Sequence, residues 1–232
     1  MARSQNGYSA NDPTRIQRLL VPDTDVKLSV RKGPAGALLI YVASRVNEVE
    51  KISTGRGALD DWGYAARKVR GGTSLSNHAS GTAIDLNALQ HPLGKRGTWS
   101  KAQKDHIHRV LDYTRRTVRW GEDYIVRKDG MHFEIVQPEW RVRQVVATLG
   151  IRMDGTRRTP RITRALSHGM RGPDVRRLQL MLGLRGEQVT EVMDRRTIDA
   201  LKAWQRKRNL AVDGVFGKYS TAAVGWIWEG TK

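Results

Sequence analysis

The stretch SNHASGTAIDL, residues 76–86, places an imidazole and a carboxylate seven positions apart. Its last five residues favour β-structure, and Ala83 and Asp85 alternate with the larger apolar residues Ile84 and Leu86. We therefore predict a short strand on which Ala83 and Asp85 share one face. His78 would lie on the turn that enters this strand, with the small residues Gly81 and Ala83 between it and Asp85. Because the chain can bend back at such a turn, we expect the side chains of His78 and Asp85 to lie beside each other.

In a second stretch, DGMHFEI at residues 129–135, the side chains alternate from Met131 onward. Three apolar residues alternate with His132 and Glu134, a pattern that predicts a strand with an apolar back and a polar front. Asp129 is expected in a turn just before this strand, close enough to reach a group bound by His132.

Neutral histidine and ionised aspartate are good zinc ligands, and a catalytic zinc usually has three protein ligands and a water. His78 and Asp85 are therefore too few, and His132 is the best candidate for the third ligand. The remaining histidines are expected not to be ligands: His91, His106, His108 and His168.

These residues resemble a known family. The pattern Ser76-x-His78-x-x-Gly81-x-Ala83-x-Asp85, followed by Asp129-x-x-His132, resembles zinc peptidases that include D-alanyl-D-alanine carboxypeptidases and L-alanyl-D-glutamate endopeptidases. The resemblance covers roughly residues 25–150. It implies that the chain is a peptidase with Zn²⁺ as its cofactor.

The resemblance also implies the role of each residue. His78, Asp85 and His132 would hold the zinc and leave a fourth position for a water, whose pKa the metal lowers to roughly 7. Asp129 would accept the proton of this water during attack on the peptide carbonyl. Arg67, which lies eleven residues before the first ligand, would stabilise the oxyanion together with the metal.

Two further residues belong to the expected site. Ser76 is a candidate substrate contact, as in the resembling family. Glu134 faces the same way as His132, and it either orients that histidine or forms a structural salt bridge. The pattern does not decide between these two possibilities.

The composition is strongly basic: 41 lysines and arginines against 23 aspartates and glutamates give a net charge of +18. Such a charge draws a protein to polyanions, namely nucleic acid, anionic lipid or the acidic polymers of a bacterial wall. The chain has no cysteine, which excludes disulfides and thiolate zinc sites.

The first 14 residues are polar and lack the apolar core of a signal peptide. The longest apolar run, residues 37–43, is too short to span a bilayer. We therefore expect a chain that stays in the cytoplasm until another agent releases it.

The remaining pattern up to residue 150 predicts an α+β domain with a small antiparallel sheet and flanking helices. Residues 1–24 are expected to form an N-terminal arm, with a short helix at 13–20. The other expected elements are a strand at 26–30, a helix that opens at Pro34, a strand at 64–69, a helix at 101–119 and a helix at 138–150.

Residues 151–165 contain five arginines, a glycine and a proline, and they read as an exposed basic linker. From 166 to 232 the pattern predicts a three-helix, all-α module that resembles the peptidoglycan-binding modules of wall hydrolases. The motif Asp213-Gly214-Val215-Phe216-Gly217 is part of this resemblance. In the first half of the module, residues 192–197 keep the threonine of the family's turn but lose its glycines, which leaves the geometry of that turn open.

A zinc peptidase joined to a wall-binding module on a strongly basic chain looks like a phage endolysin that cuts the peptide stems of peptidoglycan. It would act on the wall after another protein permeabilises the membrane, as a monomer without a nucleic-acid partner. A bacterial autolysin or D-alanyl-D-alanine carboxypeptidase is the alternative enzyme. A non-catalytic binder of wall polymer or nucleic acid would explain the charge but not the expected ligands.

Overall fold

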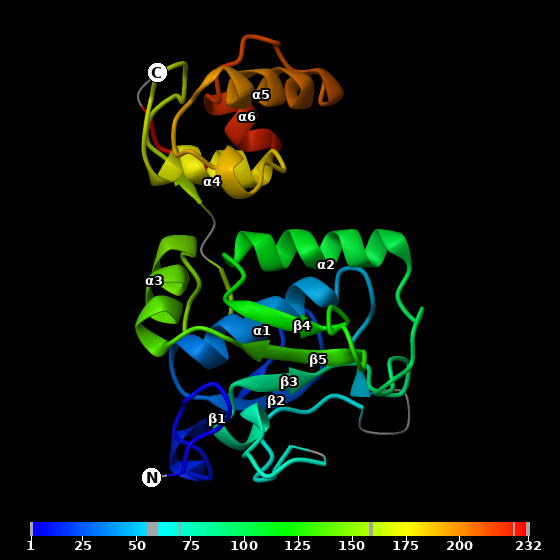
Figure 1. The fold of residues 1–232 in the computed structure, drawn as a ribbon. Coiled ribbons are helices and arrows are strands. Elements are labelled where there is room, and N and C mark those ends of the chain that lie inside the picture. The colour runs from blue at the N-terminus through cyan, green and yellow to red at the C-terminus, as the bar shows by residue number, and fades with distance from the viewer. Residues whose placement is uncertain (1, 55–59, 70, 158–159, 225, 231–232) are drawn as a thin grey trace. The chain divides into compact units, whose positions relative to one another are not determined.

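A computed structural model describes residues 2–54, 60–69, 71–157, 160–224 and 226–230. The chain divides into two compact units, Met1–Arg157 and Arg158–Lys232. Figure 1 shows that the first unit combines small sheets with helices and that the second is mainly helical. The predicted α+β class with a helical module is therefore confirmed. The division falls inside the segment that was expected to be the linker.

The central sheet of the first unit has three antiparallel strands in the order β3-β5-β4. These strands are β3 (Ala83–Asp85), β5 (Asp129–Ile135) and β4 (Val118–Gly121). The two predicted motif strands are thus neighbours, and their register places Asp85 directly opposite His132. This pairing brings a carboxylate and an imidazole together from positions far apart in the sequence.

Asp129 is the first residue of β5. The prediction that it lies in a turn before this strand is therefore wrong. It pairs with Gly121 at a register shift that follows Trp120. A Cβ on Gly121 would lie 2.4 Å from the carbonyl oxygen of Asp129, so only glycine allows the two strands to approach this closely. The pairing with β4 extends β5 to Asp129 and Gly130, which precede the alternating residues 131–135.

The expected N-terminal arm is part of the folded unit. After a short 3-10 helix, η1 (Pro13–Arg15), residues Ile16–Leu20 form β1, which pairs antiparallel with β2 (Lys27–Arg31). The short helix expected over 13–20 is therefore mostly strand. Tyr8 and Val21 are buried in the same core as the central sheet. The polar composition concealed this packing because hydrogen bonds, rather than apolar contacts, hold much of the segment.

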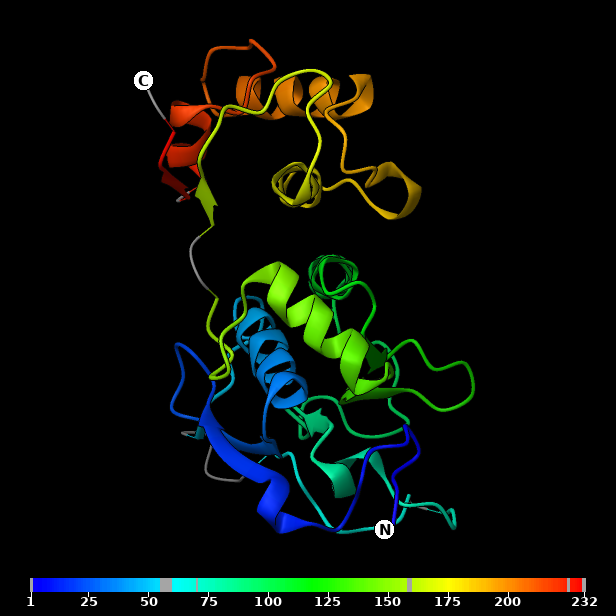
Figure 2. The same ribbon diagram turned by 90° about the vertical axis from the view of Figure 1, so that its left-hand side faces the viewer.

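Helix α1 (Pro34–Val46) packs against β2, β5, α2 (Lys101–Tyr113) and α3 (Glu139–Leu149). Figures 1 and 2 show α1 on one face of the central sheet, with α2 and α3 beside it. Ten of its 13 residues are buried, as expected for the central helix of the unit. Pro34 begins the helix as predicted, since proline is well suited to the first turn.

Helix α2 begins after Ser100, whose side chain accepts a hydrogen bond from the backbone of Gln103, as predicted for a helix cap. It ends at Tyr113, six residues earlier than we expected. Arg115 and Arg116 have left-handed backbone angles, φ 56° and 49°, which stop the helix. The apolar residues that follow belong to β4 and not to the helix.

Two other expected segments differ in the structure. Residues 64–69 form no regular strand and make only one isolated bridge, between Lys68 and Leu75. Residues 151–157, expected in the linker, fold back onto the first unit with Ile151 buried. Gly155 lies against Ile40 with φ +84°, where a Cβ would be only 2.3 Å from the isoleucine methyl. A contact this close marks 151–157 as packed structure.

The second unit contains α4 (Pro173–Met181), η4 (Gly186–Gln188), α5 (Arg195–Lys207) and α6 (Lys218–Ala223). The three predicted helices are therefore present. Two short parallel strands, β6 (Arg161–Ile162) and β7 (Ile227–Trp228), pair the ends of the unit. The unit has its own apolar core around Phe216, and Trp204, Trp226 and Trp228 pack against it as partly buried residues.

Two buried glutamines give the second unit an internal repeat. Gln179 donates from its amide to the Val192 carbonyl and accepts from the backbone N–H of Glu191. Gln205 makes the same two bonds, to the Val215 carbonyl and from the Gly214 N–H.

The backbone angles of the repeat also correspond. Glu191 and Gly214 both have positive φ, 62° and 74°. The first turn therefore keeps the geometry of the second although its glycine is replaced, which answers the question that the sequence left open.

Within the described residues, no helix combines the length and the apolar character that crossing a bilayer requires.

Candidate metal centre

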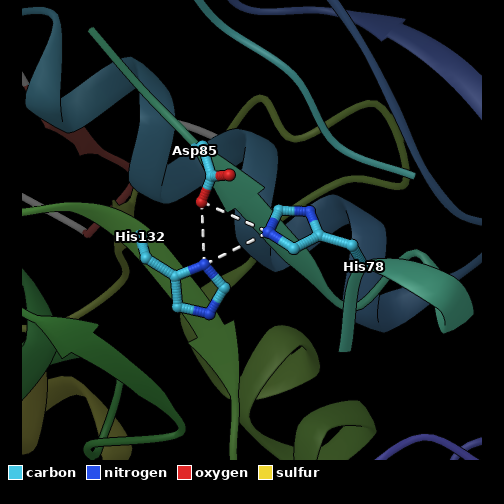
Figure 3. A group of neighbouring side chains, drawn as sticks. All are labelled: His78, Asp85 and His132. Carbon is cyan, nitrogen blue, oxygen red and sulfur yellow. Dashed lines mark hydrogen bonds and ion pairs between the residues drawn. The ribbon is translucent and has the colours of Figure 1, made fainter. Parts of the chain in front are cut away.

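Three side-chain atoms converge at the edge of the central sheet (Figure 3). His78 Nε2 and His132 Nδ1 lie 3.2 Å apart. Asp85 Oδ1 lies 3.2 Å from the first of these atoms and 2.8 Å from the second. His78 and Asp85 are buried, and His132 is partly buried. The structure thus brings together all three residues that the sequence motifs predicted.

The turn before β3 positions His78. This residue lies in η3 (Asn77–Ser80), whose N-cap Ser76 accepts a hydrogen bond from the His78 N–H at 3.2 Å. Gly81 ends η3 with φ +67°, and a Cβ there would lie 2.6 Å from the backbone nitrogen of Arg31. Glycine is therefore required for the chain to reverse and enter β3, four residues before Asp85.

The neighbours of His78 and Asp85 fix which atoms face the centre. The Nδ1 atom of His78 lies 2.6 Å from the carbonyl oxygen of Gly63. A carbonyl can only accept, so Nδ1 carries the hydrogen and Nε2 presents a lone pair. The indole N–H of Trp62 donates to Asp85 Oδ2 at 2.7 Å, which leaves Oδ1 toward the two histidines. Sequence reasoning missed Trp62 and Gly63, since neither belongs to a recognisable motif.

Glu134 lies behind His132, with its Oε2 atom 3.4 Å from His132 Nε2. It also forms an ion pair with Arg119 at 2.5 Å and accepts a hydrogen bond from the Tyr124 hydroxyl at 2.5 Å. Both contacts that the sequence allowed, with the histidine and with a cation, are therefore present. An acceptor at Nε2 favours the tautomer whose Nδ1 lone pair points to the centre.

The N-terminal segment forms hydrogen bonds with residues around the candidate centre. Asn77 donates to Glu134 Oε2 at 2.5 Å and accepts from the backbone N–H of Asn6 at 3.0 Å. The side-chain amide of Asn6 donates to the Thr82 hydroxyl at 2.8 Å and to the Ile135 carbonyl at 2.9 Å. Asn6 therefore connects Thr82, which directly precedes β3, with Ile135, the last residue of β5.

Charges within the centre are strongly coupled. Burial alone would raise the pKa of Asp85, but its hydrogen bonds with His132 and His78 lower that pKa well below its usual range. Burial would lower the pKa of His132, but the neighbouring carboxylates Asp85 and Glu134 raise it to about 10. A metal ion at the centre would therefore compete with a proton for the nitrogen of His132.

The distances fit a tetrahedral metal site. Zinc bonds of about 2.0–2.2 Å to nitrogen and oxygen would separate tetrahedral ligands by roughly 3.3–3.5 Å. The separations of 2.8–3.2 Å between the three atoms are slightly shorter, so small side-chain rotations would admit the ion. Among the residues that the structure describes, these three form the one such group of histidines and carboxylates.

A cavity of about 360 Å³ opens beside the three converging atoms, and Asp129, Arg67 and Ser76 line it. The Oδ1 atom of Asp129 is buried and has no hydrogen-bond partner among the residues that the structure describes. Burial, helped by the charge of Asp85, raises the pKa of Asp129 above that of an ordinary aspartate. Asp129 is thus a poorly solvated carboxylate next to the candidate metal centre, an arrangement suited to accepting a proton.

Arg67 and Ser76 lie in the same cavity. The guanidinium of Arg67 is 3.9 Å from Asp85 Oδ2, and its side chain is 45% exposed. A cation in this place can interact with a substrate while remaining near the centre. Ser76 is buried and caps η3, so its hydroxyl has a structural bond in addition to its place at the cavity wall.

Two tryptophans hold the backbone next to Asp129. The carbonyl of Gly130 accepts from the indole N–H of Trp120 at 2.8 Å and from that of Trp99 at 3.2 Å. His91 stacks on Trp99 with ring centroids 3.7 Å apart. The first residues of β5 are therefore fixed from the core side.

The described structure gives three of the remaining histidines partners outside the centre. His91 contacts Glu50 and Thr98, His106 contacts the Arg45 carbonyl, and His108 contacts Asp123. His168 lies in the second unit and is exposed. None of the four belongs to the converging group.

Comparisons with known proteins gave two family matches. A family described as D-alanyl-D-alanine carboxypeptidase matches residues 70–135, which include η3, β3, β4 and β5. A family described as a putative peptidoglycan binding domain matches residues 171–221, which include α4 and α5. No curated protein and no solved structure matched the chain. The two family matches confirm the combination that the motifs resembled, and they support a peptidase that acts on the cell wall.

Proposed function

We propose that the chain is a zinc-dependent peptidase that cleaves the peptide stems of bacterial peptidoglycan. The observation that supports this most directly is the convergence of His78 Nε2, Asp85 Oδ1 and His132 Nδ1 beside a cavity lined by Asp129. The donor set of two imidazoles and one carboxylate is typical of catalytic zinc sites.

When bound, zinc would supply a water of lowered pKa and a positive charge that polarises the substrate carbonyl. His78, Asp85 and His132 hold the ion in this proposal, and Glu134 keeps the His132 ring in its ligating tautomer.

Asp129 accepts the proton of the attacking water and passes it to the leaving amine. Its raised pKa favours the first half of this transfer, since the group is a stronger base than an ordinary aspartate. Arg67 interacts with the negative charge that develops on the carbonyl oxygen. Ser76 contacts the substrate from the cavity wall.

We further propose that the chain serves as a phage endolysin that reaches the wall after the membrane has been permeabilised. The pairing of a peptidase with a wall-binding module supports a lytic role. The net charge of +18 favours residence on acidic wall polymers. A bacterial autolysin or a D-alanyl-D-alanine carboxypeptidase would use the same centre, and the bond that is cut separates these possibilities.

Digestion of purified peptidoglycan followed by mass spectrometry tests the proposal. An endopeptidase releases stems with a new amino terminus, whereas a carboxypeptidase removes only a terminal residue and does not lyse cells. Purified protein should contain zinc, and a chelator should abolish cleavage until zinc is restored. If walls remained intact and no zinc bound, the chain would be a non-catalytic wall binder.

A further inference from the structure

Three arginines line the cavity beside the candidate metal centre, and they differ in the hydrogen bonds and ion pairs that they form. Arg119 is committed to Glu134, with its Nε at 2.9 Å and its Nη2 at 2.5 Å from the same carboxylate oxygen. Arg67 makes a single long contact, 3.9 Å to Asp85. Arg127 has no hydrogen bond or ion pair with any residue that the structure describes.

Arg127 occupies a particular place in the fold. It lies in the connection between β4 and β5, two residues before Asp129 and close to Gly94, whose built Cβ would be 3.5 Å from Arg127 Nε. The side chain is exposed on the solvent side but lines the same cavity as Asp129 and His132. A guanidinium with no partner among the described residues, and with five N–H donors open to solvent or to a ligand, therefore borders the cavity where a substrate would lie.

We propose that Arg127 binds a carboxylate of the substrate and thereby determines which peptides the site accepts. This inference rests on the proposed peptidase function. A guanidinium matches a carboxylate through two parallel hydrogen bonds, which fix both the position and the direction of the bound group. Arg119 already neutralises Glu134 and Arg67 lies beside Asp85, so among the described arginines of the cavity Arg127 is the one without an acidic partner.

The substrate class is thus a peptide with a free carboxylate close to the scissile bond. Two sources offer this chemistry in a wall stem peptide: the carboxylate at its C-terminus and the free carboxylate of an acidic residue within it. Either group would anchor the peptide through Arg127 while the scissile carbonyl lies at the metal centre. Binding by such an anchor contributes equally before and during reaction, so its loss should raise KM more than it lowers kcat.

The test compares Arg127→Gln and Arg127→Lys with Arg109→Gln in the zinc-loaded full chain. Arg109 is exposed on α2, away from the cavity, so its variant removes the same charge without touching the site. Each protein is assayed on three soluble stem peptides: one with both carboxylates free, one amidated at the C-terminus and one amidated at the internal carboxylate.

For the free peptide, Arg127→Gln should raise KM about 10–100-fold with kcat changed little, which corresponds to loss of a charge-assisted hydrogen-bonded pair. Arg127→Lys should recover part of the loss, because it restores the charge but not the paired geometry. Arg109→Gln should match the unaltered protein. The peptide whose amidation removes the difference between the unaltered protein and Arg127→Gln identifies which carboxylate is bound.

The inference is overturned if Arg127→Gln and the unaltered protein show the same preference for free over amidated peptides. Peptide dissociation constants are measured separately on the Asp129→Asn variant and on the double variant that also carries Arg127→Gln. This measurement needs no turnover. Cleavage without any effect of Arg127 would contradict the carboxylate site alone. Absence of cleavage in the unaltered protein, with an Arg127-dependent dissociation constant, would contradict the peptidase function and support the carboxylate site.

Discussion

Asp129 is the residue whose environment most clearly suits a catalytic group. Its carboxylate lines the cavity, one of its oxygens is buried without a partner, and it does not belong to the converging ligand group. Asp129→Asn keeps the size of the side chain but removes the carboxylate that is proposed to act as the base. We expect turnover to fall roughly 10²–10⁴-fold, the usual contribution of such a group.

Zinc content and melting temperature distinguish the other roles of Asp129. Both should change little in Asp129→Asn if the residue is the base. Loss of zinc from the variant would mark Asp129 as a ligand, and full turnover would exclude the mechanism. Asp129→Glu should retain partial activity, since the longer side chain keeps the charge but displaces it.

The pH dependence of the reaction follows from the same residue. Because burial raises the pKa of Asp129, the carboxylate becomes protonated, and so unable to accept a proton, at a higher pH than an ordinary aspartate. The value of kcat/KM should therefore fall as the pH decreases through this raised pKa. This acidic limb should be missing from the residual activity of Asp129→Asn.

At the scale of elements, the N-terminal segment connects β3 and β5 behind the candidate centre. Asn6→Ala removes the hydrogen bonds to the Thr82 hydroxyl and the Ile135 carbonyl. We expect the zinc dissociation constant to rise about 10-fold, the lower end of the effect of residues that support metal ligands. Competition with a chromophoric chelator measures this change.

Arg3→Ala provides the control for Asn6. The Arg3 side chain lies in the same segment, and its one partner among the described residues is the exposed carbonyl of Gly7. Its variant should bind zinc like the unaltered protein. Equal affinity in the Asn6 and Arg3 variants would show that the segment packs on the unit without supporting the centre.

The repeated turns of the second unit give a stability prediction. Glu191 has a left-handed backbone, φ 62°, where the equivalent turn has Gly214. Glu191→Gly removes the steric strain of a side chain at positive φ, and the greater freedom of glycine in the unfolded chain offsets part of the gain. We expect a net stabilisation of about 0.5–1 kcal/mol, visible by calorimetry as a higher melting temperature of the second unit.

The reverse change tests the same reasoning. Gly214→Ala should destabilise the unit, because its Cβ would lie 2.9 Å from side-chain atoms of both Ile198 and Lys202. If Glu191→Gly were destabilising instead, the ion pair of Glu191 with Arg176 would matter more than the backbone strain.

Sequence reasoning reached the candidate centre because its candidate ligands lie in two short motifs, each with a strand whose alternation is clear. His78, Asp85 and His132 could be predicted as neighbours in this way. Trp62 and Asn6 could not, because Trp62 reaches Asp85 and Asn6 reaches Asn77 through pairings between distant segments that no local pattern records.

The boundaries of the elements were less predictable for a similar reason. Left-handed backbone at Arg115 and Arg116 ended a helix whose apolar spacing continued, and hydrogen bonds held an N-terminal segment that composition marked as loose.

At the scale of the whole molecule, the two units each have their own apolar core. A chain that ends after Arg157 should therefore fold, since residues 151–157 belong to the first unit. A chain that ends soon after Ile151 would instead leave this buried side chain exposed. It should cleave soluble stem peptides as well as the full chain does. On intact walls we expect a rate about 10–100-fold lower, because the local concentration supplied by tethering is lost.

Turbidity of permeabilised cells and release of soluble peptides, measured on one preparation, compare the two activities. Equal rates on intact walls would show that the second unit does not direct the peptidase to its substrate. A parallel loss on soluble peptides would instead show that the second unit supports the fold or the centre of the first.

The central claim is that His78, Asp85 and His132 hold a catalytic zinc, and the metal content of His78→Ala tests it most directly. Two remaining ligands bind zinc poorly, so zinc should fall from about one per chain to a small fraction, and cleavage should disappear with it. Binding to walls should persist, and His168→Ala, which changes an exposed histidine of the second unit, should keep both zinc and activity. A His78→Ala protein that purified with one zinc per chain and still cleaved peptidoglycan would contradict the account.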